Sequence, residues 1–126
     1  MSVRIAIGVI INDENQVLIT KRSAKQHQGN KWEFPGGKVE TEETSQEALC
    51  RELKEEVGID VQITDFLMNI SHSYDDKKVL LDVYEVKRWA GEARSLEDQL
   101  MKWVKKSDLK NYEFPDANAD ILRKLT

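Results

Sequence analysis

The chain has 126 residues, of which 40% are hydrophobic and 33% charged, and its formal net charge at pH 7 is -4. These values predict one globular domain, residues 1–126, and the acidic balance argues against stable nucleic-acid binding through a basic surface. The single cysteine, Cys50, excludes an internal disulfide and suits the cytoplasm, and the apolar run 5–11 is too short to span a membrane.

The first half of the chain contains apolar segments that predict strands. Residues 3–11 and 17–22 are β-branched runs separated by a polar turn, which indicates a hairpin. Residues 23–31 are polar and contain glycine, so we expect a surface loop there. The alternation in Trp32-Glu33-Phe34 then predicts a short strand, which Pro35-Gly36-Gly37 interrupts.

The clearest predicted element is a helix over residues 45–57. Thr44 and Glu47 have the spacing of a capping box at its start, and Gly58 stands where a left-handed cap would end it. One face of the helix carries an apolar stripe, which we expect to be buried: Leu49, Leu53 and Val57.

The second half of the chain predicts more strands and a final helix. In order, we expect a strand at 59–70, a turn at 75–77, a strand at 78–89, a loop at 90–99, a strand at 101–104 and a helix at 116–125. Mixed strands with two helices, too few for a doubly wound sheet, predict an α/β sandwich.

Three glutamates of the predicted helix, Glu52, Glu55 and Glu56, share one face because they stand at i, i+3 and i+4. Each like-charged pair destabilises a helix by about 0.2–0.5 kcal/mol, and the last turn also disfavours negative charge. A solvated acidic face is the ordinary interpretation. The alternative is a cation site, for which oxygen ligands without His or Cys favour Mg²⁺ or Mn²⁺ over zinc.

Neighbouring residues support the cation hypothesis. Gly36 and Gly37 lack a Cβ atom, so their backbone can approach a ligand closely, although Pro-Gly-Gly also occurs in ordinary turns. Arg51 can hold the adjacent Glu52 carboxylate in one orientation through a planar fork and so contribute to catalysis. The alternative for Arg51 is a routine surface charge.

Together these residues resemble the Nudix box, the motif of the Nudix hydrolase family. The matching pattern is Gly37-x5-Glu43-x7-Arg51-Glu52-Leu53-x-Glu55-Glu56-x-Gly58-Ile59. The family cleaves a nucleoside diphosphate linked to another group, with divalent cations, on an α/β/α sandwich with a central mixed β-sheet. The resemblance assigns cation binding to Glu52, Glu55 and Glu56, with a backbone carbonyl from the turn at Gly36.

Residues outside the box are similar to the MutT branch of the family. The similar stretches are Thr20-Lys21-Arg22, Asn30-Lys31-Trp32-Glu33-Phe34-Pro35-Gly36-Gly37-Lys38 and Phe114-Pro115-x-Ala117-Asn118. The resemblance implies hydrolysis of 8-oxo-dGTP to 8-oxo-dGMP and pyrophosphate, which sanitises the nucleotide pool and prevents mutation. Two features depart from the branch: Lys77 stands where arginine is expected, and the loop 92–101 lacks the expected glycines and proline, although Glu97 still aligns.

The resemblance also implies roles in the reaction for single residues. Attack of water on the β-phosphorus needs a base, and Glu52 and Glu97 are both candidates. Glu97 is also a candidate cation ligand, beside Glu55 and Glu56. Lys38 would bind phosphate or assist departure of the leaving group, although a lysine after a turn is more often simply solvated.

Asn118 is the candidate for reading the base. Guanine presents N7 as an acceptor beside O6, whereas N7 of 8-oxoguanine carries a hydrogen. An asparagine amide can donate to O6 and accept from N7–H, which would favour the oxidised base. The alternative role for Asn118 is that of a helix-end cap or turn residue. By the resemblance, Arg22, Phe34 and Lys77 would border the same base.

Two other functions stay open on the sequence. The box is compatible with another nucleoside triphosphate or nucleoside diphosphate derivative as substrate. A nucleotide-sensing module without catalysis is the other alternative, but such modules often lack box glutamates that this chain retains. The expected partners are a small nucleotide and Mg²⁺, or Mn²⁺ in its place, bound by a cytoplasmic monomer without a membrane segment.

Overall fold

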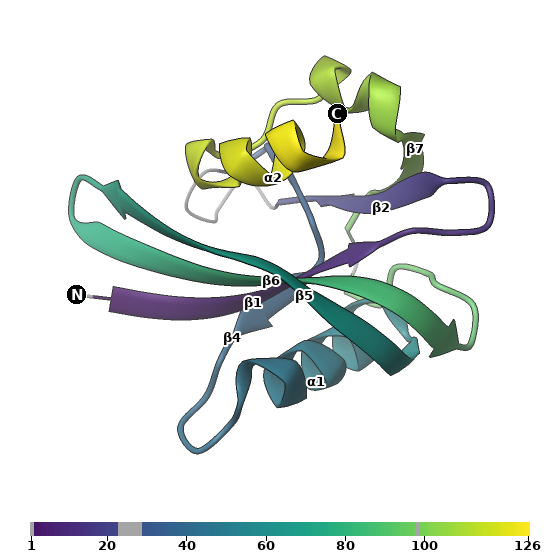
Figure 1. Ribbon diagram of the computed structural model, residues 1–126, viewed down its shortest axis with the longest axis horizontal. Coiled ribbons are helices and arrows are strands. Elements are labelled where there is room, and N and C mark those ends of the chain that lie inside the picture. Colours follow the sequence, from purple (N-terminus) through teal and green to yellow (C-terminus); the bar gives the residue numbers. More distant parts are fainter. Residues whose placement is uncertain (1, 23–28, 98) are drawn as a thin grey trace.

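The structure, a computed structural model, describes residues 2–22, 29–97 and 99–126. Figure 1 shows its strands and helices. Their bounds are β1 (Ser2–Ile10), β2 (Gln16–Lys21), β3 (Trp32–Glu33), β4 (Gly36–Lys38), α1 (Ser45–Val57), β5 (Asp60–Tyr74), β6 (Lys77–Ala90), β7 (Met101–Lys105), the 3₁₀ turns η1 (Lys106–Asn111) and η2 (Asp116–Asn118), and α2 (Ala119–Leu125). Most of the predicted loop 23–31 lies outside the described residues.

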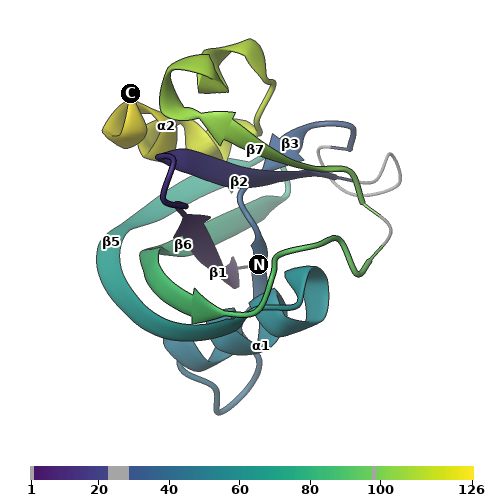
Figure 2. The same cartoon turned by 90° about the vertical axis from the view of Figure 1, so that its right-hand side faces the viewer.

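The strands form two sheets, and α1 and α2 lie on opposite sides of the larger one (Figure 1). The larger sheet has the order β4-β1-β6-β5, in which β1 and β6 are parallel and the other neighbours antiparallel. The smaller, antiparallel sheet has the order β3-β2-β7 and lies on the same side as α2 (Figure 2). A mixed sheet between helices confirms the predicted α/β sandwich.

The predicted hairpin of residues 3–11 and 17–22 is wrong, because β1 and β2 belong to different sheets. Within the described chain, an isolated antiparallel bridge between Ile11 and Val17 is what remains of the expected ladder. The physical reason is that both edges of β1 are occupied. β6 pairs with β1 along the whole length of β1. On the other edge of β1 lie β4 and the carbonyl of Pro35.

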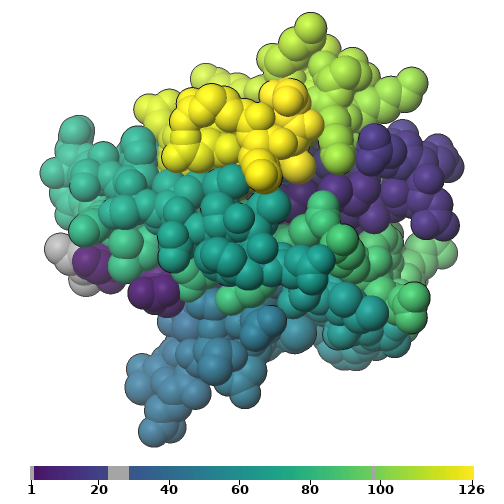
Figure 3. Space-filling view, in the orientation of Figure 1, coloured from purple at the N-terminus to yellow at the C-terminus, as the bar shows by residue number. Residues whose placement is uncertain are grey.

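The predicted helix 45–57 is confirmed as α1, and both of its ends follow the sequence signals. The Glu47 N–H donates to the Thr44 hydroxyl at 3.1 Å, and the Thr44 N–H donates to the Glu47 carboxylate at 2.9 Å. Gly58 ends the helix in the left-handed conformation, with φ at 72°. The exposed turn that precedes α1 protrudes from the body of the protein (Figure 3).

The other predicted elements are present with altered ends. β5 and β6 extend beyond the predicted strands 59–70 and 78–89 and form a long hairpin with a turn at 75–76. The chain resumes as β4 at the predicted interruption 35–37. The helix predicted at 116–125 starts late, because its first turn is the 3₁₀ turn η2. No helix among the described residues is long and apolar enough to cross a bilayer.

Two hydrophobic cores cover the two faces of the larger sheet. One lies against α1 and includes the predicted stripe of Leu49, Leu53 and Val57, all fully buried. The other lies between the two sheets, η1 and α2, around the buried ring of Phe34. Gly8 of β1 lets α1 approach closely, since a Cβ atom there would lie 3.1 Å from the Leu53 Cδ1 atom.

Candidate active site

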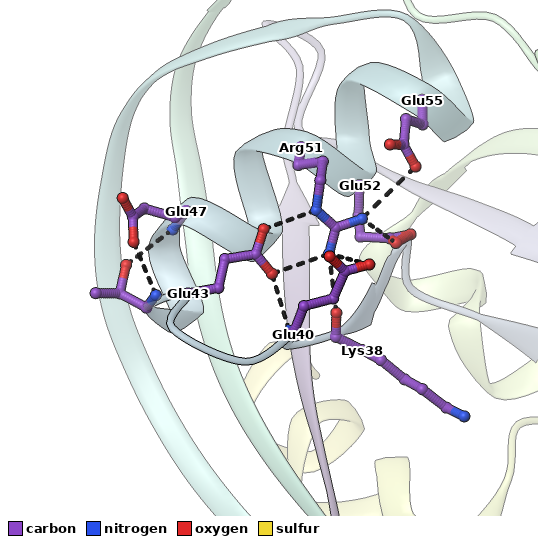
Figure 4. A network of polar contacts seen from close by, with 8 residues as sticks. Lys38, Glu40, Glu43, Glu47, Arg51, Glu52 and Glu55 are labelled. Carbon is purple, nitrogen blue, oxygen red and sulfur yellow. Dashed lines mark hydrogen bonds and ion pairs between the residues drawn. The ribbon is translucent and has the colours of Figure 1, made fainter.

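Arg51 joins α1 to β4 and to the turn between them (Figure 4). Its Nε and Nη2 atoms donate to the two carboxylate oxygens of Glu43 at 2.7 and 3.0 Å. Nη2 also donates to the Lys38 carbonyl oxygen at 3.0 Å, while Nη1 donates to Glu52 at 2.9 Å and lies 3.6 Å from Glu55. The bond with Arg51 lowers the pKa of Glu43 to about 2, and the same bond raises the pKa of Arg51. The expected fork therefore forms chiefly with Glu43, and it holds Glu52 at the same time.

The Glu52 carboxyl group lies directly against the backbone of Gly37. A Cβ atom at Gly37 would lie 2.3 Å from the Glu52 carboxyl carbon, so with any other residue the Glu52 carboxylate would have to move aside. Burial raises the pKa of Glu52, and the hydrogen bond from Arg51 opposes this rise. The Glu52 carboxylate of α1 therefore lies against the glycine turn where a ligand was expected to approach.

Glu56 is the most buried glutamate among the described residues, with 4% of its surface exposed. Its two carboxylate oxygens accept hydrogen bonds from the Thr20 hydroxyl and the Gly36 N–H, both at 3.3 Å. Burial raises the pKa of Glu56 to about 8, and the charges of Glu33 and Glu97 act in the same direction. A buried carboxylate beside other carboxylates, held by long hydrogen bonds, is a group that a cation would stabilise.

Glu55 and Glu97 are the exposed members of the predicted cation site. The Glu55 side chain is 53% exposed, and Glu97 lies in an exposed bend between β6 and β7. That bend is attached to the end of α1, because the Leu96 N–H donates to the Glu56 carbonyl oxygen at 3.0 Å. Within the described residues, no three His, Cys, Asp or Glu side chains already form a cation site. The oxygen donors present fit Mg²⁺, but side chains would have to move to enclose it.

One pocket of about 290 Å³ connects the carboxylates with the residues predicted to contact the base. From the catalytic and cation set, its lining includes Gly36, Gly37, Lys38, Glu52, Glu56 and Glu97. From the substrate set, it includes Arg22, Phe34, Lys77 and Asn118. The structure therefore brings both predicted sets together, while Arg51 and Glu55 lie outside the lining of this pocket.

Asn118 is 6% exposed, and its Oδ1 atom has no hydrogen-bond partner among the described residues. Asn118 lies in the turn η2, as the turn alternative expects, and at the N-cap position of α2, but its side chain makes no capping hydrogen bond, so the expected side-chain cap is wrong. Leaving a buried acceptor unsatisfied costs about 1–3 kcal/mol, which a donor on a ligand would recover. Nearby in the pocket lining, Phe34 stacks on Phe114 with ring centroids 5.1 Å apart.

The residues of the site that received no role from the sequence include Thr20, Glu33 and Tyr74. Glu33 forms an ion pair with Arg22; burial raises the pKa of Glu33, and Arg22 opposes that rise. An ionisable side chain between two aromatic residues of a strand was a signal for Glu33. No comparable signal existed for Tyr74, because its hydroxyl accepts a hydrogen bond from the N–H of Ala117, 43 residues away.

Comparison with known proteins gives matches over almost the whole chain. The NUDIX domain profile matches residues 6–124. An 8-oxo-dGTP diphosphatase of Escherichia coli strain K12 is 40% identical over 122 residues, which cover 97% of this chain and 95% of the relative. A CTP pyrophosphohydrolase of the same strain is 31% identical over 115 residues, which cover 91% and 84%. A solved MutT NUDIX hydrolase from Burkholderia pseudomallei has a TM-score of 0.90 at 27% identity and covers 100% of this chain and 99% of its own.

Proposed function

The chain belongs to the NUDIX domain family, and on this premise we propose that it hydrolyses 8-oxo-dGTP to 8-oxo-dGMP and pyrophosphate. Removal of the oxidised nucleotide keeps it out of DNA and so prevents mutation. The similarity to the 8-oxo-dGTP diphosphatase, which extends over 97% of this chain, supports this substrate. Within the site, the observation that carries it is the Oδ1 atom of Asn118 in the wall of the pocket, which no described residue meets with a hydrogen bond.

The amide of Asn118 matches the edge of guanine that oxidation changes. In 8-oxoguanine N7–H is a donor, whereas N7 of guanine is an acceptor next to O6. The Oδ1 atom of Asn118, to which no residue in the described part of the chain donates, would accept from N7–H while the amide NH₂ group donates to O6. Unmodified guanine would leave that oxygen facing an acceptor, and a buried mismatch of this kind can lower kcat/KM by about 10⁴-fold.

The carboxylates around Gly36 form an oxygen donor set suited to Mg²⁺, with Mn²⁺ as its substitute. The proposed ligands are Glu52, Glu55, Glu56 and Glu97 with the Gly36 carbonyl. When bound, the cation neutralises charge on the phosphate oxygens and orients the attacking water. The burial of Glu56 between two long hydrogen bonds supports this assignment, because the described residues offer its carboxylate little else to stabilise a negative charge.

Glu52 and Glu97 are the two candidates for the base that removes a proton from the attacking water. Burial raises the pKa of Glu52, which makes its carboxylate a stronger base. Glu97 lines the same pocket from the loop between β6 and β7. Arg51 orients Glu52 through the 2.9 Å hydrogen bond, and Lys38 lines the pocket as a partner for phosphate oxygens.

Arg22, Phe34 and Lys77 complete the proposed nucleotide site. Glu33 holds the guanidinium of Arg22 through an ion pair, and Lys77 supplies a point charge in place of an arginine fork. The proposed partner is thus a small nucleotide. We expect the chain to act on it as a monomer in the cytoplasm, without a stable nucleic-acid complex.

Steady-state rates on a panel of nucleotides with Mg²⁺ test this function. We expect kcat/KM for 8-oxo-dGTP to exceed that for dGTP by at least about 100-fold, because the buried amide rejects guanine N7. Glu52→Gln should abolish pyrophosphate release while the thermal unfolding curve stays cooperative. Equal rates on the two guanine nucleotides at low substrate concentration would reject the base assignment.

CTP is the second candidate substrate, because the CTP pyrophosphohydrolase relative covers 91% of this chain. A higher kcat/KM for CTP than for any oxidised purine nucleotide would favour it. A nucleotide sensor would bind members of the panel without releasing pyrophosphate from any of them. If the wild type releases pyrophosphate and Glu52→Gln does not, the sensor is excluded.

A further inference from the structure

Tyr74, the last residue of β5, lines the pocket together with Asn118 of η2. A hydrogen bond joins the two segments: the Ala117 N–H donates to the Tyr74 hydroxyl oxygen at 3.1 Å. We infer that Tyr74 is a positioning residue for base recognition, whose hydroxyl fixes the backbone at Ala117 and thereby aims the Asn118 amide at the base. This inference rests on the proposed function, and it concerns a residue outside the Nudix box.

The Ala117 N–H needs a partner that its own turn does not supply. The first N–H groups of a helical turn have no partner within that turn. η2 begins after Pro115, which provides no side-chain cap, and Ala117 is only 5% exposed, so water has little access to its N–H. The hydroxyl of Tyr74, from a strand 43 residues earlier, satisfies this donor.

The backbone at Ala117 sets the position of Asn118 because none of the described residues holds the Oδ1 atom of the Asn118 side chain. Its Oδ1 atom lacks a hydrogen-bond partner among the described residues, and the side chain does not cap α2. The Asn118 N–H donates to the Pro115 carbonyl oxygen at 2.9 Å, so the turn moves as a unit. Two hydrogen bonds in one plane to O6 and N7–H tolerate little rotation of the amide.

Tyr74→Phe tests the inference, because it removes the hydroxyl and keeps the ring. We expect KM for 8-oxo-dGTP to rise about tenfold while kcat changes little, so that selectivity over dGTP falls by the same factor. Calorimetry with 8-oxo-dGMP in metal-free buffer should show the same loss of affinity. Amide hydrogen exchange should be faster at Ala117. The matched control is Tyr112→Phe, a tyrosine that packs edge-on against Trp32 and lies outside the pocket lining.

A double-mutant cycle separates positioning from a merely structural role. In an Asn118→Ala background, Tyr74→Phe should cause no further loss of selectivity, because Tyr74 acts through Asn118. If the wild type prefers 8-oxo-dGTP and Tyr74→Phe keeps the same selectivity, the inference is overturned and the proposed function stands. Equal losses for 8-oxo-dGTP and dGTP with a lowered Tm would assign Tyr74 a structural role and also overturn it. A wild type without any preference for 8-oxo-dGTP would overturn both.

Discussion

The buried carboxyl group of Glu56 contributes strongly to the way the stability of the metal-free protein depends on pH. Its pKa in the folded state is raised to about 8, chiefly by burial, whereas the unfolded chain exposes an ordinary carboxyl. Between the two pKa values the folded state holds one proton more than the unfolded state. The free energy of unfolding must therefore fall as pH rises through this window, by up to about 1.4 kcal/mol per pH unit.

The first prediction is that Glu56→Gln flattens this dependence in metal-free buffer. The neutral amide keeps the shape of the side chain and cannot titrate, so the variant should be more stable than the wild type at the upper end of the window. Urea unfolding at several pH values below the Glu56 pKa of about 8 measures the slope. Glu55→Gln, at a side chain 53% exposed, is the control that should keep it. An unchanged slope in Glu56→Gln would contradict the assigned pKa.

Replacing Asn118 by alanine should weaken recognition of the base without lowering the stability of the protein. We predict that Asn118→Ala lowers kcat/KM for 8-oxo-dGTP by at least about tenfold, while the smaller rate on dGTP changes less. Its free energy of unfolding should not fall, because the variant removes a buried Oδ1 atom that has no partner among the described residues. Steady-state kinetics on both nucleotides and urea unfolding give the two values. Equal losses for the two nucleotides would remove Asn118 from the base site.

The elements that could be predicted are those whose signals are local. The bounds of α1 followed from Thr44, Glu47 and Gly58, all of which act within a few residues of the helix ends. The partner of β1 could not be predicted in this way, because polar residues between two apolar runs suit a hairpin and a sheet-to-sheet connection equally. The choice depended on β6, more than sixty residues further along the chain, which pairs with β1 from Ser2 to Ile10.

The close approach of β4 and α1 gives a prediction at this scale. Gly37→Ala would place a Cβ atom 2.3 Å from the Glu52 carboxyl carbon, so the carboxylate must move away from β4. A displacement of about 1 Å at a catalytic group can cost about 100-fold in rate, and we expect a loss of that order in kcat. Thermal unfolding should show only a modest destabilisation. In a Glu52→Ala background, which removes the clash, Gly37→Ala should not destabilise the protein further; equal destabilisation in both backgrounds would contradict this cause.

At the scale of the whole molecule, the sequence motif indicated which residue types the site would contain. It did not indicate which other segments of the chain would meet there. The glutamates of α1 and the glycines of β4 are close in sequence, so their proximity followed from one helix and one turn. Glu33 entered the site through its ion pair with Arg22, which directly follows the neighbouring strand β2 of the smaller sheet. Tyr74 entered it through a hydrogen bond with Ala117 of η2, 43 residues away. The contact of Tyr74 depends on how β5 and η2 pack, which no local pattern records.

The site lies where both sheets and α1 meet, so we predict that cation binding stabilises the whole fold. Glu56 of α1 accepts hydrogen bonds from Thr20 of the smaller sheet and from Gly36 of the larger sheet. A ligand at 100 times its Kd raises the free energy of unfolding by about 2.7 kcal/mol. Because Glu56 must lose its proton to bind a cation, the rise in Tm caused by Mg²⁺ should be larger near its pKa of about 8 than at lower pH.

Thermal unfolding with and without Mg²⁺, repeated across this pH range, measures the coupling between the cation and the fold. Glu56→Gln provides the matched control, because it removes the titrating group and a negative ligand together. In that variant the rise in Tm should be small and independent of pH. A rise that is equal at every pH in the wild type, or that survives unchanged in Glu56→Gln, would show that the cation binds elsewhere. Since Glu56 connects α1 to both sheets, the stabilisation should appear as one cooperative shift of the whole unfolding curve.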